Sequence, residues 1–176
     1  MYQRESVVVL IVFQNSESGY LTSVGGICPT RTLACKFDTG ATNTIIGLGC
    51  FPYYMRENIR LHMSHLIASH NCKGHIFESA SGDSIVGYPT MCRNVVIGGV
   101  QFRRFHYYLI PNFELRKFLL GKDFISCCKF EHVVDGDITV TEFSNGKYEQ
   151  QASNAIDMLE ILELVSNVSA ESNVFT

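Results

Sequence analysis

The sequence predicts one mostly-β domain, and three observations support this. Short apolar runs rich in β-branched residues recur along the 176-residue chain and are typical of buried strands. Turns that contain glycine, asparagine or aspartate separate many of these runs, as in β-hairpins. Only two longer segments, 53–69 and 152–165, have helical spacing. A composition of 46% hydrophobic and 18% charged residues fits a folded domain with a substantial core.

The strands are expected in the following places along the chain. Residues 7–13 are apolar throughout and predict a buried strand. Residues 20–26 and 27–37 are expected to pair as a hairpin. Further strands are expected at 44–48 and 105–110. Hairpins are expected over 76–88, with the turn at Ser81-Gly82-Asp83, and over 95–102, with the turn at Gly98-Gly99. A last hairpin is expected to turn at Ser144-Asn145-Gly146, between 138–143 and a segment that begins at 147.

The two helical segments differ in how much of their surface is apolar. In 53–69 the apolar residues gather on one face, which predicts an amphipathic helix; they are Met55, Ile59, Met63, Leu66 and Ile67. In 152–165 few positions are polar, so a helix there must bury most of its circumference, against the domain's own sheet or a partner subunit.

Charge and cysteine content exclude some classes of partner. A net charge of −3 and a pI near 6.0 argue against nucleic acid. The apolar run at 7–13 is too short to span a membrane and lacks the cleavage site of an export signal. The seven cysteines are an odd number, so at least one thiol has no partner within the chain. Because no export signal is recognised, we expect reduced thiols and a cytoplasmic protein without a membrane partner.

The most informative stretch is 33–46, where an apolar run leads into Asp38, Thr39 and Gly40 and the chain then turns apolar again. Asp38 is therefore expected at the exit of a buried strand, with Gly40 where a side chain would obstruct the backbone. Burying a carboxylate is costly unless it is hydrogen-bonded or shares a proton, and catalytic acids and bases exploit that cost. Asp-Thr-Gly alone is also an ordinary turn sequence. A second signal, Phe-Leu-Leu-Gly-Lys-Asp-Phe at 118–124, adds to it.

In this order the two motifs resemble those of the retropepsin-like aspartic proteases, over residues 7–130. The resemblance implies a closed-barrel-like, mostly-β retropepsin fold with one short helix. Residues 1–130 would form the protease domain and 131–176 a C-terminal hairpin and helix, packed on the same domain or on a dimer partner. The implied activity is aspartic endopeptidase, a hydrolase acting on a peptide or protein substrate without a cofactor or metal.

The resemblance also implies roles for individual residues. Asp38 would be the catalytic carboxylate, Thr39 would hydrogen-bond across a dimer axis, Gly40 would let the loop approach the substrate, and Ala41 would line the pocket. A substrate-covering flap would include Ser79, Ala80, Ser81 and Gly82, and a structural motif would comprise Gly121, Lys122 and Asp123.

In one place the chain departs from the family pattern. Retroviral relatives often carry acidic residues after the first motif, and one of them pairs with the basic residue of the second. Here Thr42 and Asn43 stand in those places, so Lys122 needs another partner or stays solvated.

The chemistry implies a homodimer. Aspartic proteases use two facing carboxylates that share one proton, and the chain carries Asp-x-Gly only at Asp38. A twofold dimer would place Asp38 against its own copy, which would complete the pair.

Three other functions remain open. The same fold could bind peptides or mediate dimerisation without cleaving, since fold does not fix function. A cluster within 62–75 could bind zinc, although its spacing matches no established zinc pattern; it comprises His62, His65, His70, Cys72 and His75. Cysteine-based hydrolysis has candidate residues but no local signature.

Overall fold

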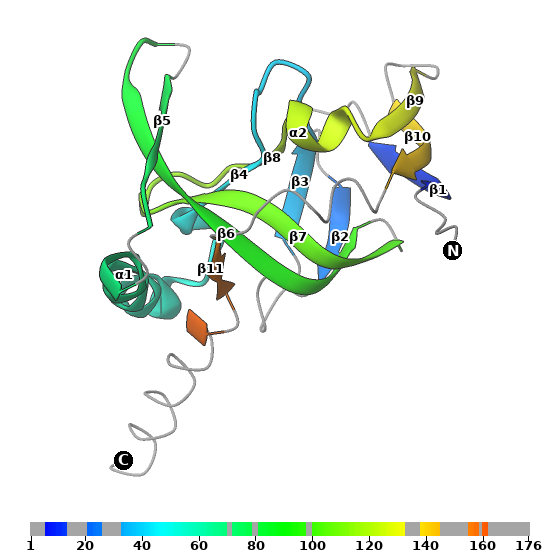
Figure 1. The fold of residues 1–176 in the computed structure, drawn as a ribbon. Coiled ribbons are helices and arrows are strands. Elements are labelled where there is room, and N and C mark those ends of the chain that lie inside the picture. The colour runs from blue at the N-terminus through cyan, green and yellow to red at the C-terminus, as the bar shows by residue number, and fades with distance from the viewer. Residues whose placement is uncertain are drawn as a thin grey trace.

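The structure, a computed structural model, describes residues 6–13, 21–25, 33–69, 72–78, 81–97, 100–132, 138–144, 155–158 and 160–161. Strands dominate this part, which confirms the mostly-β prediction (Figure 1). In chain order the elements are β1 (Ser6–Phe13), β2 (Leu21–Gly25), β3 (Leu33–Phe37), β4 (Ile45–Gly47), the 3-10 turn η1 (Leu48–Cys50), α1 (Tyr53–Ser69), β5 (His75–Glu78), β6 (Ser84–Ile97), β7 (Val100–Ile110), β8 (Phe118–Leu120), α2 (Lys122–Ile125), β9 (Cys128–His132), β10 (Ile138–Ser144) and β11 (Ile156–Asp157).

The strands form two main sheets. The larger follows the order β11-β6-β2-β3-β8-β4-β7, with β5 paired to β6 and with β6 also paired to β7. The smaller has the order β1-β10-β9 and lies at the other end of the molecule from α1 (Figure 1). The described part of the structure does not show the closed barrel that the resemblance implies.

Strands β6 and β7 are longer than the sequence pattern indicates. The pattern ends one strand at residue 88 and divides the next pair around 103–104. In the structure the two strands pair in one register, from Tyr88↔Leu109 to Arg93↔Arg104 and again from Val95↔Phe102 to Ile97↔Val100. The ladder continues past Pro89 and exposed Arg93 because backbone pairing does not require an apolar side chain at each step. The expected turn at 98–99 lies outside the described residues.

Aromatic packing joins the two sheets to α2. The Phe102 ring on β7 lies edge-on to Phe143 on β10, with centroids 5.0 Å apart. Phe124 on α2 contacts both rings, at 5.9 Å from Phe102 and 4.8 Å from Phe143. All three side chains are almost completely buried. This cluster fixes α2 against the core, directly after β8.

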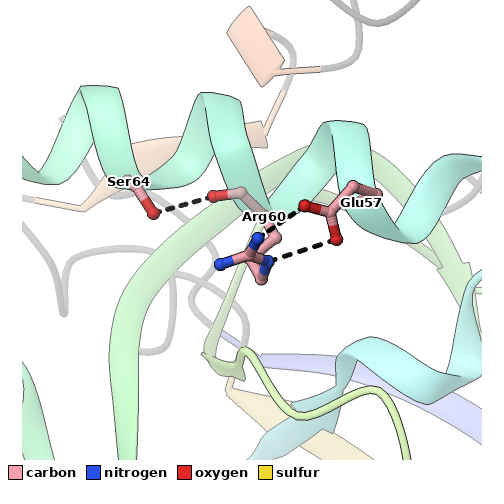
Figure 2. Close-up of polar contacts among 3 residues, drawn as sticks. All are labelled: Glu57, Arg60 and Ser64. Atoms are coloured by element: carbon pink, nitrogen blue, oxygen red, sulfur yellow. Dashed lines mark hydrogen bonds and ion pairs between the residues drawn. The ribbon is translucent and has the colours of Figure 1, made fainter.

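Helix α1 spans Tyr53–Ser69, as predicted, and buries the predicted face. On its exposed side, the Arg60 guanidinium donates to both carboxylate oxygens of Glu57, and the Ser64 hydroxyl donates to the Arg60 carbonyl (Figure 2). The hydrogen bond from Arg60 lowers the pKa of Glu57. Arg60 also lies over the Phe113 ring, 5.8 Å from its centroid, so α1 contacts the segment that leads to β8.

The C-terminal region differs from the expectation of a helix over 152–165. Residues Ile156–Asp157 instead form β11, which pairs in parallel with Thr90–Met91 of β6. The described residues 158, 160 and 161 are helical, and the remainder of the predicted helix lies outside the described residues, as does the predicted turn at 145–146. Pairing with β6 satisfies backbone groups of Ile156 and Asp157 that a helix would have satisfied internally. The side chains of Ile156, Met158 and Ile161 join the main hydrophobic core.

Within the described part of the chain, no helix combines the length and the apolar character needed to cross a membrane.

Replacing Ile59 with alanine tests the packing of α1. Ile59 is fully buried, so Ile59→Ala should lower the free energy of unfolding by about 2–5 kcal/mol through lost burial and a cavity. Leu61 on the same helix is 53% exposed, and Leu61→Ala is the matched control, with an expected loss below about 1 kcal/mol. Urea denaturation of both variants measures the difference, and equal losses would contradict the packing of α1 described here.

Candidate functional site

The loop of residues 38–44, called here the Asp38 loop, connects β3 to β4 around an intervening strand. β8 pairs in parallel with β3 and antiparallel with β4, so it lies between them. Asp38 follows directly after β3, whose Cys35 and Phe37 are buried, as predicted for a carboxylate at the exit of a buried strand. Its backbone N–H donates to the Leu120 carbonyl of β8 at 2.9 Å. The start of the loop is therefore fixed to the sheet.

The far end of the loop is held by a buried threonine. The Thr44 hydroxyl donates to Asp123 Oδ1 at 2.7 Å, and its N–H reaches both carboxylate oxygens at 2.9 and 3.0 Å. The same hydroxyl oxygen accepts from the Gly121 N–H at 3.1 Å. Asp123 also accepts from the Phe124 N–H at 2.7 Å, at the start of α2. Thr44 is completely buried, so these hydrogen bonds satisfy groups that water cannot reach.

The predicted motif of Gly121, Lys122 and Asp123 thus contacts the Asp38 loop directly. A side chain at Gly121 would place its Cβ 2.4 Å from the Asn43 backbone, so only glycine fits there. The Lys122 N–H donates to the Ala41 carbonyl at 2.8 Å. The Lys122 side chain is exposed and forms no ion pair with any residue that the structure describes. The contact between Lys122 and the loop is therefore made by its backbone.

Asp38 itself is half-buried, and one oxygen of its carboxylate is held within the loop. The Gly40 N–H donates to Asp38 Oδ1 at 2.9 Å. A Cβ on Gly40 would lie 3.3 Å from that oxygen and would crowd the carboxylate. Thr39 is exposed beside it, and Ala41 is half-buried. The loop therefore holds a partly accessible carboxylate in a defined orientation.

Asp38 lines a groove of about 550 Å³ that lies between the Asp38 loop and the β5–β6 hairpin. In Figure 1 this hairpin projects from the body on the same side as the loop that joins β3 to β4. The groove is lined by the loop, both hairpin strands and the segment that leads into β8: Asp38, Gly40, Ala41, Thr42, Asn43, Ile45, His75, Ile76, Phe77, Glu78, Ile85, Leu115, Lys117 and Leu119.

The predicted flap corresponds to the β5–β6 hairpin. Glu78 pairs with Ser84, and Gly82 in the turn has φ +84°, a conformation that favours glycine. The Ser81 hydroxyl donates to Asp83 at 3.1 Å across the turn. Ser81 and Gly82 do not line the groove, whereas strand residues do; Ser79 and Ala80 lie outside the described residues.

An aromatic cluster at the base of the hairpin connects it to the Asp38 loop. His75 lies 4.6 Å from Phe77 and 5.3 Å from Tyr108, measured between ring centroids. The Tyr108 N–H donates to the Thr44 carbonyl at 2.9 Å. Burial and then the charge of Asp123 raise the pKa of the Tyr108 phenol. Tyr108 therefore contacts both the hairpin and the end of the Asp38 loop.

Among the described residues, the side chains of the predicted zinc cluster are not grouped to hold a metal, and three of the thiols are unsuited to catalysis. His75 packs in the aromatic cluster, and no three histidine, cysteine, aspartate or glutamate side chains in the described ranges are grouped to hold a metal; His70 lies outside those ranges. Burial is the main cause that raises the pKa of Cys35, Cys92 and Cys128 to about 12. These thiols are protonated at neutral pH and are poor nucleophiles.

Sequence reasoning missed Thr44 and Tyr108. It treated Thr44 only as the first residue of an apolar strand, although a hydroxyl residue at the entry to a buried strand is itself a signal that a partner is present. No sequence signal marks Tyr108, because its role depends on the pairing of β7 with β4.

Replacing Thr44 with valine tests how the loop is held. Thr44→Val keeps the shape but leaves the Gly121 N–H without its acceptor, so the free energy of unfolding should fall by about 1–3 kcal/mol. Thr42 is exposed in the same loop, and Thr42→Val should change it by less than about 0.5 kcal/mol. Guanidinium titration compares the two, and an unaffected Thr44→Val protein would show that these hydrogen bonds contribute little.

Comparisons with known proteins find a likeness among solved structures. No family profile matches the chain, and no curated protein matches it. The crystal structure of a retropepsin-like aspartic protease from Rickettsia conorii aligns with 81% of this chain and 98% of its own, at 17% sequence identity and a TM-score of 0.49. A likeness at this level does not by itself assign the chain to a family.

Proposed function

We propose that the chain is an aspartic endopeptidase of the retropepsin type that acts as a homodimer. One observation carries the proposal: the Asp38 carboxylate opens into a groove whose opposite side is the β5–β6 hairpin. In the sequence the Asp38 loop and the β5–β6 hairpin are two separate features. In the structure both of them line the same groove. An extended peptide of a few residues suits a groove of this size and shape.

The proposed chemistry uses water rather than a covalent intermediate. Asp38 and its copy in the second subunit share one proton, since two neighbouring carboxylates resist double ionisation. The ionised member takes a proton from water, and the protonated member polarises the scissile carbonyl. The hydrogen bond from Gly40 to Oδ1 leaves the other Asp38 oxygen available for this exchange. The hairpin limits access of bulk water to the groove.

Two further parts of the proposal follow from the resemblance. Thr39, exposed beside Asp38, makes the hydrogen bonds that join the two loops across the dimer axis. The protein acts in the cytoplasm, which agrees with Cys35, Cys72, Cys92 and Cys128 lying outside any disulfide.

Replacing Asp38 with asparagine tests catalysis. Asp38→Asn removes the group that activates water, so cleavage of a peptide library should fall to background while peptide binding persists. Glu131→Gln makes the same kind of carboxylate-to-amide change at an exposed position on β9 and should leave cleavage unchanged. Mass spectrometry of the products measures cleavage. If neither the unmodified protein nor Asp38→Asn cleaves any peptide but both bind peptides, the non-cleaving binding module is correct.

Dilution tests the dimer. Half of the catalytic pair comes from each subunit, so specific activity should fall as the protomer concentration drops below the dimer dissociation constant. Sedimentation velocity over the same concentrations should show dimers converting to monomers in parallel. Turnover that is independent of concentration, from a protein that sediments as a monomer, would exclude a shared active site.

A further inference from the structure

One wall of the groove alternates between core and groove positions. Phe118 and Leu120 are buried in the core, whereas Leu115, Lys117 and Leu119 line the groove. This period of two is that of an extended chain, and it places Lys117 between two leucines on the groove side. The backbone of Lys117 is fixed, since its carbonyl accepts from the Gly47 N–H of β4 at 2.9 Å. The wall is thus apolar except for one ammonium group.

The Lys117 ammonium has no partner among the described residues. Its side chain is exposed, and no described residue forms an ion pair or side-chain hydrogen bond with it. The other ionisable residues that line the groove are Asp38, Glu78 and His75. The two acidic residues belong to the Asp38 loop and the hairpin, and His75 packs in the aromatic cluster. Among the described residues that line the groove, Lys117 is the one lysine or arginine.

We infer that Lys117 binds a carboxylate of the substrate and makes this groove selective for an acidic group near the scissile bond. The inference rests on the proposed function, because it concerns the same groove. The Lys117 side chain is exposed in the free protein, and a peptide bound against the flanking leucines would exclude part of the water around it, where a charged hydrogen bond is stronger. The carboxylate could be an aspartate or glutamate side chain, or the C-terminal carboxylate of a short peptide. Asp38 and Glu78 repel an acidic group elsewhere in the groove, so the selectivity applies to one position.

The test compares matched peptides. Once a peptide library gives the cleavage sites, peptides that differ only by glutamate or glutamine at each position near the cleaved bond are compared by kcat/KM. At one position kcat/KM should be about tenfold higher, or more, for the glutamate peptide than for the glutamine peptide. In Lys117→Met the ratio of the two kcat/KM values should fall towards one. Lys117→Glu should reverse the preference towards lysine. Free-acid and amidated forms of each peptide distinguish a side-chain carboxylate from a C-terminal one.

Arg116 supplies the matched control. It is the neighbouring residue, has the same charge, is exposed and does not line the groove. Arg116→Met should keep the full glutamate preference, so an equal loss in both variants would reduce the effect to net charge and overturn the inference. A ratio that Lys117→Met leaves unchanged would overturn it as well.

A binding measurement separates this inference from the proposed function. If the unmodified protein cleaves no peptide, the proposed function fails, and calorimetry with the same glutamate and glutamine peptides still decides the role of Lys117. A preference for glutamate that Lys117→Met abolishes supports the inference. Equal binding of both peptides, or no binding, overturns it.

Discussion

The candidate site depends on the hydrogen bonds that Thr44 makes with Asp123 and Gly121. A loop that carries an accessible carboxylate cannot be fixed by burying that carboxylate, so it must be fixed at its ends. One end is fixed where the Asp38 N–H meets β8, and the other where Thr44 meets the start of α2. A buried hydroxyl is suited to this role because it donates and accepts at once, and leaving either group without a partner would be costly.

Packing in the core also fixes the residues that hold the Asp38 loop and the hairpin in place. Phe124 follows Asp123 and packs against Phe102 and Phe143, so the residues that hold the loop are themselves held by both sheets. On the other side, Tyr108 binds the Thr44 carbonyl and contacts the aromatic residues at the base of the hairpin. Carboxylate and hairpin thus share a common support, which suits the proposed binding of an extended peptide in one register.

The groove combines few charges with a largely apolar lining. Asp38 lies on the loop, Glu78 on the hairpin and Lys117 on the wall that leads into β8. In such a groove the apolar surface provides contact area, and isolated charges provide discrimination between ligands. The chemistry proposed for Asp38 and the selectivity proposed for Lys117 therefore use separate residues, and either can be altered without replacing the other.

The sequence by itself determined the local features. It predicted α1, the turn at Gly82 and the carboxylate at the end of β3, because each follows from nearby apolar spacing or from turn residues. The motif at Gly121 before α2 was identified through the family resemblance. The tertiary structure alone decided what depends on partners distant in the chain. Thr44 and Asp123 are 79 positions apart, and residues Ile156–Asp157 form a strand because β6 offers backbone groups to pair with. Local spacing carries no information about such partners, which is why sequence reasoning missed Thr44 and expected a helix at β11.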